Sequence, residues 1–132
     1  ELWSIVKAIV WVVQNNWKLA DKGIWEFRNK DQHFTFSKLL CWVAVDRAIK
    51  ISYLIQDGKS AKKWENLREE IHSDIMQNAW NEQRQSFMQS YNSTHLDASV
   101  LLMEYYGFIK AKDPKYVKTV KAIEKELMHE GL

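Results

Sequence analysis

A carboxylic acid set between aromatic side chains is the feature of this sequence best suited to chemistry. Residues 23–28 read Gly-Ile-Trp-Glu-Phe-Arg, which places Glu26 directly between Trp25 and Phe27. Partial removal from water by the two rings would raise the pKa of Glu26 and keep its carboxyl group protonated near neutral pH, as a general acid requires. Arg28 would oppose that shift if it pointed the same way. A Glu in such a loop is more often a surface or capping residue than a catalyst, so the residues alone leave both interpretations open.

Aromatic side chains are frequent in and beside two long polar stretches, 20–33 and 81–94. The chain holds seven Trp, five Tyr and five Phe. Those in or near the polar stretches are Trp17, Trp25, Phe27, Phe34, Trp80, Phe87 and Tyr91. Flat rings beside polar groups suit sugars, because C–H groups pack on the ring while hydroxyl groups reach polar neighbours. Large rings also fill gaps between helices, so packing is the competing interpretation for each of them.

Helices are predicted to position both polar stretches. Gly and Pro are scarce, with four and one in the chain, and apolar periodicity predicts five helical stretches. They cover about 2–17, 35–56, 61–80, a stretch around 98–103, and the residues after 114. The first helix is expected to bury the face formed by Leu2, Val6, Ile9, Val13 and Trp17.

The predicted helices differ in how much of their surface is apolar. The second helix, with Thr35 or Ser37 as its N-cap, is apolar on every side over 39–45 and is expected to be covered all round. The third is amphipathic. It is expected to bury Trp64, Leu67, Ile71 and Ile75 and to expose Lys62, Lys63, Glu69 and Glu70. The fourth is again apolar all round, and the fifth, capped by Asp113 with Pro114 in its first turn, is amphipathic.

This alternation of amphipathic and buried helices predicts an all-α fold with two layers of helices. A shift of 63 residues lays Trp17 on Trp80 and the core of the second helix on that of the fourth. Each unit would be an outer helix, a long loop and an inner helix. Two units cannot close a ring, and six would need about 380 residues. A toroid and an open solenoid are both compatible with the pattern.

Composition excludes several classes of protein. A net charge of +2 and 46% hydrophobic residues exclude a disordered tail and a polybasic nucleic-acid arm. The Lys-rich stretch 110–125 also contains Asp and Glu, so we expect a solvated outer face and no contact with nucleic acid or membrane. No apolar run reaches the roughly 18 residues that a membrane span needs. Cys41 has no partner for an internal disulfide, which suits a reducing compartment such as the cytoplasm and leaves the localisation open.

No metal or other cofactor is predicted. The four histidines are scattered without ligand spacing. Glu69 and His72 have the Glu-x-x-His spacing of di-iron bundles, but no second such pair occurs.

Further motifs accompany the segment 23–28. They are His-Phe-Thr-Phe-Ser-Lys at 33–38, Cys-Trp-Val-Ala-Val-Asp-Arg-Ala at 41–48, Leu-Asp-Ala-Ser at 96–99 and Tyr-Gly-Phe at 106–108. Together, at these spacings, they resemble the prokaryotic branch of the glucoamylase family of glycoside hydrolases, family 15. The resemblance covers essentially the whole chain. It implies an (α/α)6 toroid, of which residues 1–132 would form about a third within a single catalytic domain. It also implies inverting hydrolysis of α-glucosides, with glucoamylase, glucodextranase and trehalase activities among relatives.

The resemblance also implies roles for individual residues. Glu26 matches the general acid of the family, and Trp25 would stack at the cleft. Arg28, His33 and Lys38 would bind sugar hydroxyl groups, although Arg28 and Lys38 could equally pair with Asp31 or Glu26. Fungal relatives often carry a second Glu where this chain has Phe27, which favours small substrates such as disaccharides over long starch chains.

The general base of the family would lie after Leu132 and its glucose-binding Arg-Asp pair before Glu1. Both ends of the chain look cut, so we expect the chain alone to be inactive and to self-associate through exposed inner helices. The alternative is a non-catalytic helical-repeat module whose aromatic loops bind a peptide or an oligosaccharide.

Overall fold

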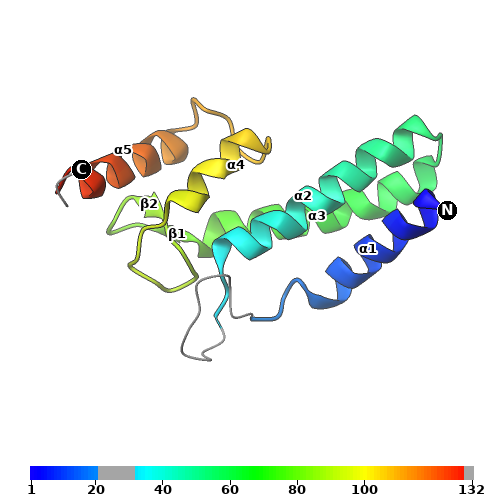
Figure 1. The fold of residues 1–132 in the computed structure, drawn as a ribbon, viewed down its shortest axis with the longest axis horizontal. Helices are drawn as coiled ribbons and strands as arrows, with labels where there is room; N and C mark the ends of the chain where they lie inside the picture. Colours follow the sequence, from blue (N-terminus) through cyan, green and yellow to red (C-terminus); the bar gives the residue numbers. More distant parts are fainter. Residues whose placement is uncertain (21–31, 130–132) are drawn as a thin grey trace.

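The structure, a computed structural model, describes residues 1–20 and 32–129. Its elements are α1 (Leu2–Asn16), α2 (Thr35–Leu54), α3 (Gly58–Asn78), β1 (Trp80–Asn81), β2 (Ser86–Phe87), the 3-10 helix η1 (Ala98–Leu101), α4 (Leu102–Tyr105) and α5 (Pro114–His129). Figure 1 shows α1, α2 and α3 side by side at one end of the molecule, with α4, α5 and the hairpin β1–β2 at the other. The prediction of a mainly helical fold is confirmed.

The helical hairpin α2–α3 forms the centre of the core. The chain reverses at Gln56, whose φ is 62°, and Asp57 then caps α3 by accepting a hydrogen bond from the Ser60 amide at 3.2 Å. The face of α3 predicted to be inward is buried throughout, and the residues predicted to be outward are exposed. The apolar period of 3.6 residues therefore located the buried face of this helix correctly.

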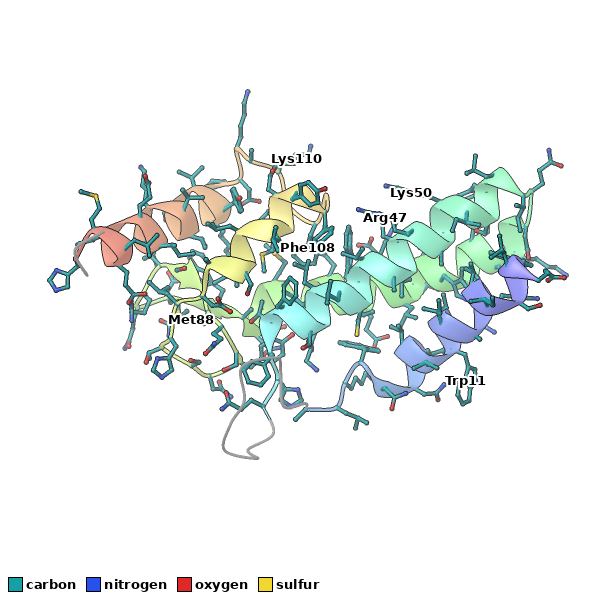
Figure 2. The ribbon with its side chains drawn as sticks, viewed as in Figure 1. Trp11, Arg47, Lys50, Met88, Phe108 and Lys110 are labelled. Atoms are coloured by element: carbon teal, nitrogen blue, oxygen red, sulfur yellow. The ribbon has the colours of Figure 1, made fainter. Side chains whose placement is uncertain are left out.

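Helix α1 lies beside this hairpin and buries part of the predicted face, since Trp17 is buried and Val6 and Val13 pack against the core. The inward face is rotated slightly from the predicted one. Val10 is buried and Trp3 packs on Trp64, with 5.5 Å between ring centroids, whereas Leu2 is 79% exposed and Ile9 48% exposed. Apolar residues surround most of α1, so its sequence fits two neighbouring faces. The contact between two large rings accompanies the face that is buried. Figure 2 shows Trp11 projecting from α1 on the side away from α2 and α3.

The start of α2 also differs from the prediction. Phe34 occupies the N-cap position without a side-chain cap, so neither Thr35 nor Ser37 is the cap. The hydroxyl group of Thr35 instead donates to the Met88 carbonyl oxygen at 2.7 Å, because the two groups meet in the buried interior. Coverage of α2 is incomplete among the described residues, since Leu40 is 43% exposed.

The region after α3, predicted to be irregular, contains a short antiparallel hairpin. Trp80 pairs with Phe87 and Asn81 with Ser86. The predicted fourth helix is short, formed by η1 and α4, and buries Val100 and Met103.

The fifth helix has the predicted cap. Asp113 accepts a hydrogen bond from the Lys115 amide at 2.9 Å at the start of α5. None of the described helices is both long and apolar enough to cross a membrane.

Candidate functional site

The structure describes two of the five predicted site residues. Trp25, Glu26 and Arg28 fall in 21–31, outside the described residues, so their predicted roles stay predictions. His33 and Lys38 lie just after that segment, and Trp17 and Leu19 lie just before it. The described part of the site therefore consists of the two flanks of the segment 21–31, which contains Trp25 and Glu26 and is called the Trp-Glu segment below.

Lys38 lies on the first turns of α2 with its ammonium group against the end of α1. Its Nζ donates to the Trp17 carbonyl oxygen at 2.5 Å and to the Leu19 carbonyl oxygen at 3.2 Å. Trp17 is the C-cap of α1, and Leu19 lies two residues beyond it. Carbonyl groups at a helix C-terminus lack partners within the helix and carry its negative dipole end, so a cation at Trp17 is stabilising. The ammonium group also lies over the face of the Trp17 ring, with 5.9 Å from Nζ to the ring centroid. Lys38 thus joins α2 to the chain that leaves α1.

Burial makes these contacts of Lys38 costly to break. The residue is only 3% exposed, although lysine is rarely buried. An ammonium group removed from water without partners would be strongly unfavourable. The two carbonyl oxygens and the faces of Trp17 and Tyr91 surround it with partial negative charge.

Tyr91 connects the same ammonium group to the other flank of the segment. The Nζ of Lys38 lies 5.8 Å from the centroid of the Tyr91 ring, and the ring of His33 stacks on Tyr91 with centroids 5.6 Å apart. The Tyr91 hydroxyl group donates to Asp74 Oδ2 on α3 at 2.7 Å. Burial raises the pKa of Tyr91, and the hydrogen bond to the Asp74 carboxylate raises it further. Tyr91 therefore stays a neutral hydrogen-bond donor at physiological pH.

Main-chain pairing fixes the second flank independently of side chains. The Tyr91 amide donates to the His33 carbonyl oxygen at 2.9 Å, and the Thr35 amide donates to the Gln89 carbonyl oxygen at 2.9 Å. Between them, Phe34 and Ser90 form an antiparallel bridge. Residues 33–35 are thereby held against the loop that follows β2, as the start of α2 and the neighbouring loop in Figure 1 indicate.

A hollow of about 340 Å³ lies beside Lys38, between the end of α1 and the start of α2. Its described lining includes the apolar side chains of Val13 and Phe34 and the polar side chains of Asn16 and Ser37. The Nδ1 atom of His33 is buried and has no hydrogen-bond partner among the described residues. A mixed apolar and polar lining of this kind suits a small polyhydroxy ligand.

A separate cluster of charged groups lies between α2 and α3. Asp46 on α2 accepts from Arg68 of α3 at 2.9 Å and from its neighbour Arg47 at 2.5 Å, and it pairs with Lys50 at 3.3 Å. Figure 2 shows Arg47 and Lys50 on the same edge of α2. Burial alone would raise the pKa of Asp46, but hydrogen bonds from Lys50, Arg68 and Arg47 outweigh that effect and lower it. This cluster fastens α2 to α3.

The Glu-x-x-His pair has other partners. Nε2 of His72 lies 3.1 Å from the Phe108 carbonyl oxygen, and Glu69 faces Arg68 at 3.8 Å. Over residues 1–20 and 32–129, no three His, Cys, Asp or Glu side chains gather as a metal ion would require.

Comparison with known proteins identifies the family of this chain. The sequence model of the glycosyl hydrolases family 15 matches residues 1–132, which is the whole chain. The chain belongs to glycosyl hydrolase family 15. The predicted family resemblance is therefore confirmed.

Relatives within this family include proteins named trehalase. One from Mycolicibacterium smegmatis is 40% identical over 131 residues, which is 99% of this chain and 20% of the relative. A trehalase from Thermoplasma acidophilum is 37% identical over 98% of this chain and 22% of its own length. Trehalase 1 from Sulfolobus acidocaldarius is 38% identical over 99% of this chain and 22% of its own length. The family 15 chain thus spans about a fifth of these relatives, and no solved structure matches it.

The contact between Tyr91 and Asp74 was missed by reasoning from the sequence. Tyr91 stood out only as one of several aromatic residues in polar stretches, and Asp74 is a half-buried charged residue at the edge of the apolar stripe of an amphipathic helix. The one local signal was the concentration of rings near 80–91, which predicts contacts but no partners.

Proposed function

We propose that this chain is part of the catalytic domain of an inverting α-glucoside hydrolase that acts on a small substrate such as trehalose, with Glu26 as its general acid. The observation that carries the proposal is the match of family 15 to all 132 residues. Relatives named trehalase, at 37–40% identity, favour a disaccharide over long starch chains. Phe27, directly after the acid, agrees with that preference.

In this proposal the chain supplies one half of a two-carboxylate mechanism. The protonated carboxyl group of Glu26 donates its proton to the glycosidic oxygen as the bond to the anomeric carbon breaks. A second carboxylate, about 6.5–9.5 Å away and outside residues 1–132, removes a proton from the water that attacks the opposite face of the sugar. The products are two sugars, with inverted configuration at the reacting carbon.

The other predicted residues would bind and orient the substrate. Trp25 offers a flat face to a sugar ring, and Arg28 and His33 offer donors to hydroxyl groups. The sequence prediction that Lys38 binds a sugar hydroxyl group stays a prediction, because its described contacts with Trp17 and Leu19 favour a positioning role.

The proposed architecture is an (α/α)6 toroid of which these residues form about a third. Pairing of α1 and α3 with α2 supports alternating outer and inner helices. Exposed apolar side chains remain on α1 and α2, among them Leu2, Ile5, Leu40, Ile51 and Leu54. We propose that further helices of the toroid cover them. The isolated chain should then self-associate in size-exclusion chromatography, and a stable monomer would contradict the toroid.

Replacing the acid in the full-length protein tests the proposed function. Glu26→Gln should lower turnover of trehalose by about 10²- to 10⁴-fold, because the leaving oxygen would depart without a proton. Turnover of α-glucosyl fluoride should fall far less, because fluoride leaves without protonation. Glu69→Gln, on the exposed face of α3, is the matched control and should leave both rates unchanged. Equal turnover of trehalose by Glu26→Gln and the wild type would remove Glu26 from the mechanism.

The isolated chain offers a second test, because it would lack the general base. It should release no glucose from trehalose or maltose. Glucose release by the 132 residues alone would overturn the proposed division of the two carboxylates. A chain that binds trehalose while the full-length protein turns over no α-glucoside would instead indicate the non-catalytic binding module.

A further inference from the structure

The two flanks of the segment 21–31 converge on a single buried pair of side chains, Lys38 and Tyr91. The flank that leaves α1 is held by Lys38 through the carbonyl oxygens of Trp17 and Leu19. The flank that enters α2 is held by Tyr91, through the stacked ring of His33 and the main-chain bond to its carbonyl oxygen. The contact of the Lys38 ammonium group with the Tyr91 ring joins the two flanks.

Tyr91 is in turn fixed to the helical core. Its hydroxyl group donates to Asp74, one turn before the end of α3. The main chain on either side of Tyr91 is held as well, since Ser90 pairs with Phe34 and Gln89 donates to the His95 carbonyl oxygen at 2.8 Å. The ring therefore has little freedom to move relative to α2 and α3.

This arrangement is more elaborate than ending a helix requires. Many helices end with water or a glycine satisfying the last carbonyl groups, at no cost of burying a charge. Here a lysine that is 3% exposed carries out that task and also contacts an aromatic ring from a loop more than fifty residues away in the sequence. A buried cation fixes geometry more strictly than a solvated one, because its partners cannot be exchanged for water.

We propose that Lys38 and Tyr91 are positioning residues that set the separation and orientation of Trp17–Leu19 relative to His33–Phe34, and through these flanks the placement of the general acid. This inference rests on the proposed function. Neither side chain is assigned a contact with the substrate. Each acts through the chain ends that it holds.

The test compares substrates that do and do not need the acid, in the full-length protein. Lys38→Met keeps the length of the side chain and removes the donors to both carbonyl oxygens. Its kcat for trehalose should fall by about 10- to 100-fold, because displacement of a catalytic group by about 1 Å is enough for such a loss. The KM for trehalose and the kcat for α-glucosyl fluoride should change by less than about threefold, because binding and the acid-independent reaction remain.

Tyr91→Phe removes a single oxygen atom and keeps the ring, so it tests the same inference if Lys38→Met fails to fold. Its kcat for trehalose should fall by about three- to tenfold, with the same sparing of KM and of α-glucosyl fluoride. The double variant should lose less than the product of the two single losses, because both act on one contact. Lys115→Met is the matched control. Lys115 also lies over a tryptophan ring, that of Trp80 at 5.0 Å, but away from both flanks, and kcat should stay at the wild-type value.

Each outcome decides the inference separately from the proposed function. Equal losses on both substrates, or a rise in KM alone, would overturn positioning in favour of general stability or sugar binding. Wild-type kinetics for Tyr91→Phe and for a folded Lys38→Met would overturn it outright. Both results leave the proposed function intact as long as Glu26→Gln shows the selective loss described above. If Glu26→Gln shows no loss, the proposed function itself has failed.

Discussion

The stretch after α1 and the stretch after α3 follow corresponding helices of the two predicted helix-loop-helix units, but their described parts are held by different means. The stretch after α3 is fixed mainly by its own hydrogen bonds. Arg84 donates to the Thr94 carbonyl oxygen at 2.7 Å, Asn81 donates to the Ser93 carbonyl oxygen at 3.3 Å, and Phe87 and Met88 are buried beneath them. The flanks of the stretch after α1 are held by residues from other elements, namely Lys38, Ser90 and Tyr91.

This difference indicates that the two stretches have different roles, although their sequence patterns are similar. The stretch after α3 contacts the flank at 32–35 through main-chain hydrogen bonds. A site is positioned most precisely when the residues that flank it are held by a packed scaffold. The proposed acid lies between the two described flanks in the sequence.

Breaking the packing of the stretch after α3 should have the largest effect. Phe87 is fully buried and packs edge-on against Trp80, with centroids 5.2 Å apart. Phe87→Ala should lower the free energy of unfolding by about 3–5 kcal/mol, because it leaves a cavity in the core. Urea titration of the full-length protein measures the change, with the exposed Met128→Ala as the control. A loss below about 1 kcal/mol would contradict a structural role of this loop.

A smaller change loosens the same loop at a single hydrogen bond. The Phe87 amide donates to Thr119 Oγ1 of α5 at 3.1 Å, and both groups are buried. Thr119→Val keeps the shape but leaves that amide without a partner, which should cost about 2 kcal/mol. Hydrogen exchange at 80–90 should become faster, while Thr94→Val on the exposed surface should leave it unchanged. Unchanged protection in Thr119→Val would mean that α5 does not stabilise the loop.

Alkaline pH should weaken the contact that holds Tyr91, in the stretch after α3, to helix α3. The pKa of Tyr91 is raised in the folded protein, so the folded state keeps its proton after the unfolded chain has lost it above about pH 10. The hydrogen bond to Asp74 therefore contributes its full stability below that pH, and the contribution declines as the pH rises toward the folded-state pKa. The free energy of unfolding of the wild type should exceed that of Tyr91→Phe by about 1.5 kcal/mol at pH 8. Urea titration at several pH values should show this difference becoming smaller above pH 10. A difference that stays constant above pH 10 would argue against a raised pKa of the Tyr91 hydroxyl group.

Removing the cation of Lys115, which lies on α5 over the Trp80 ring, should have the smallest effect. Lys115→Met loses the contact with the Trp80 ring, and a half-exposed contact of this kind contributes about 0.5 kcal/mol. The urea concentration at the midpoint of unfolding should therefore decrease slightly. If Lys115→Met lowered the free energy of unfolding as much as Lys38→Met does, the cations beside the two stretches would be equally important, and the difference between the stretches would not hold.

Reasoning from the sequence succeeded where a local pattern had a single solution. The third helix has one apolar stripe, and that stripe is buried as predicted, while Asp113 caps α5 as its place before Pro114 indicates. The same reasoning was right for only part of α1, because apolar residues surround most of that helix. Val6, Val13 and Trp17 lie inward as predicted, whereas Leu2 and Ile9 are exposed. It also missed the hairpin after α3, whose two-residue strands are too short to show an alternating pattern.

By itself the sequence determined the helices, the cap of the last one, and the family to which the chain belongs, because each depends on residues close together along the chain or on motifs at fixed spacing. Only the tertiary structure decided that Lys38, Asp74 and Tyr91 form one cluster around the flanks of the Trp-Glu segment. These residues lie on two helices and a loop, and no local pattern pairs them. Their contacts depend on how α2 and α3 pack and on where the loop after β2 lies. Because a buried ammonium group without partners is strongly unfavourable, the fold must bring these partners to Lys38.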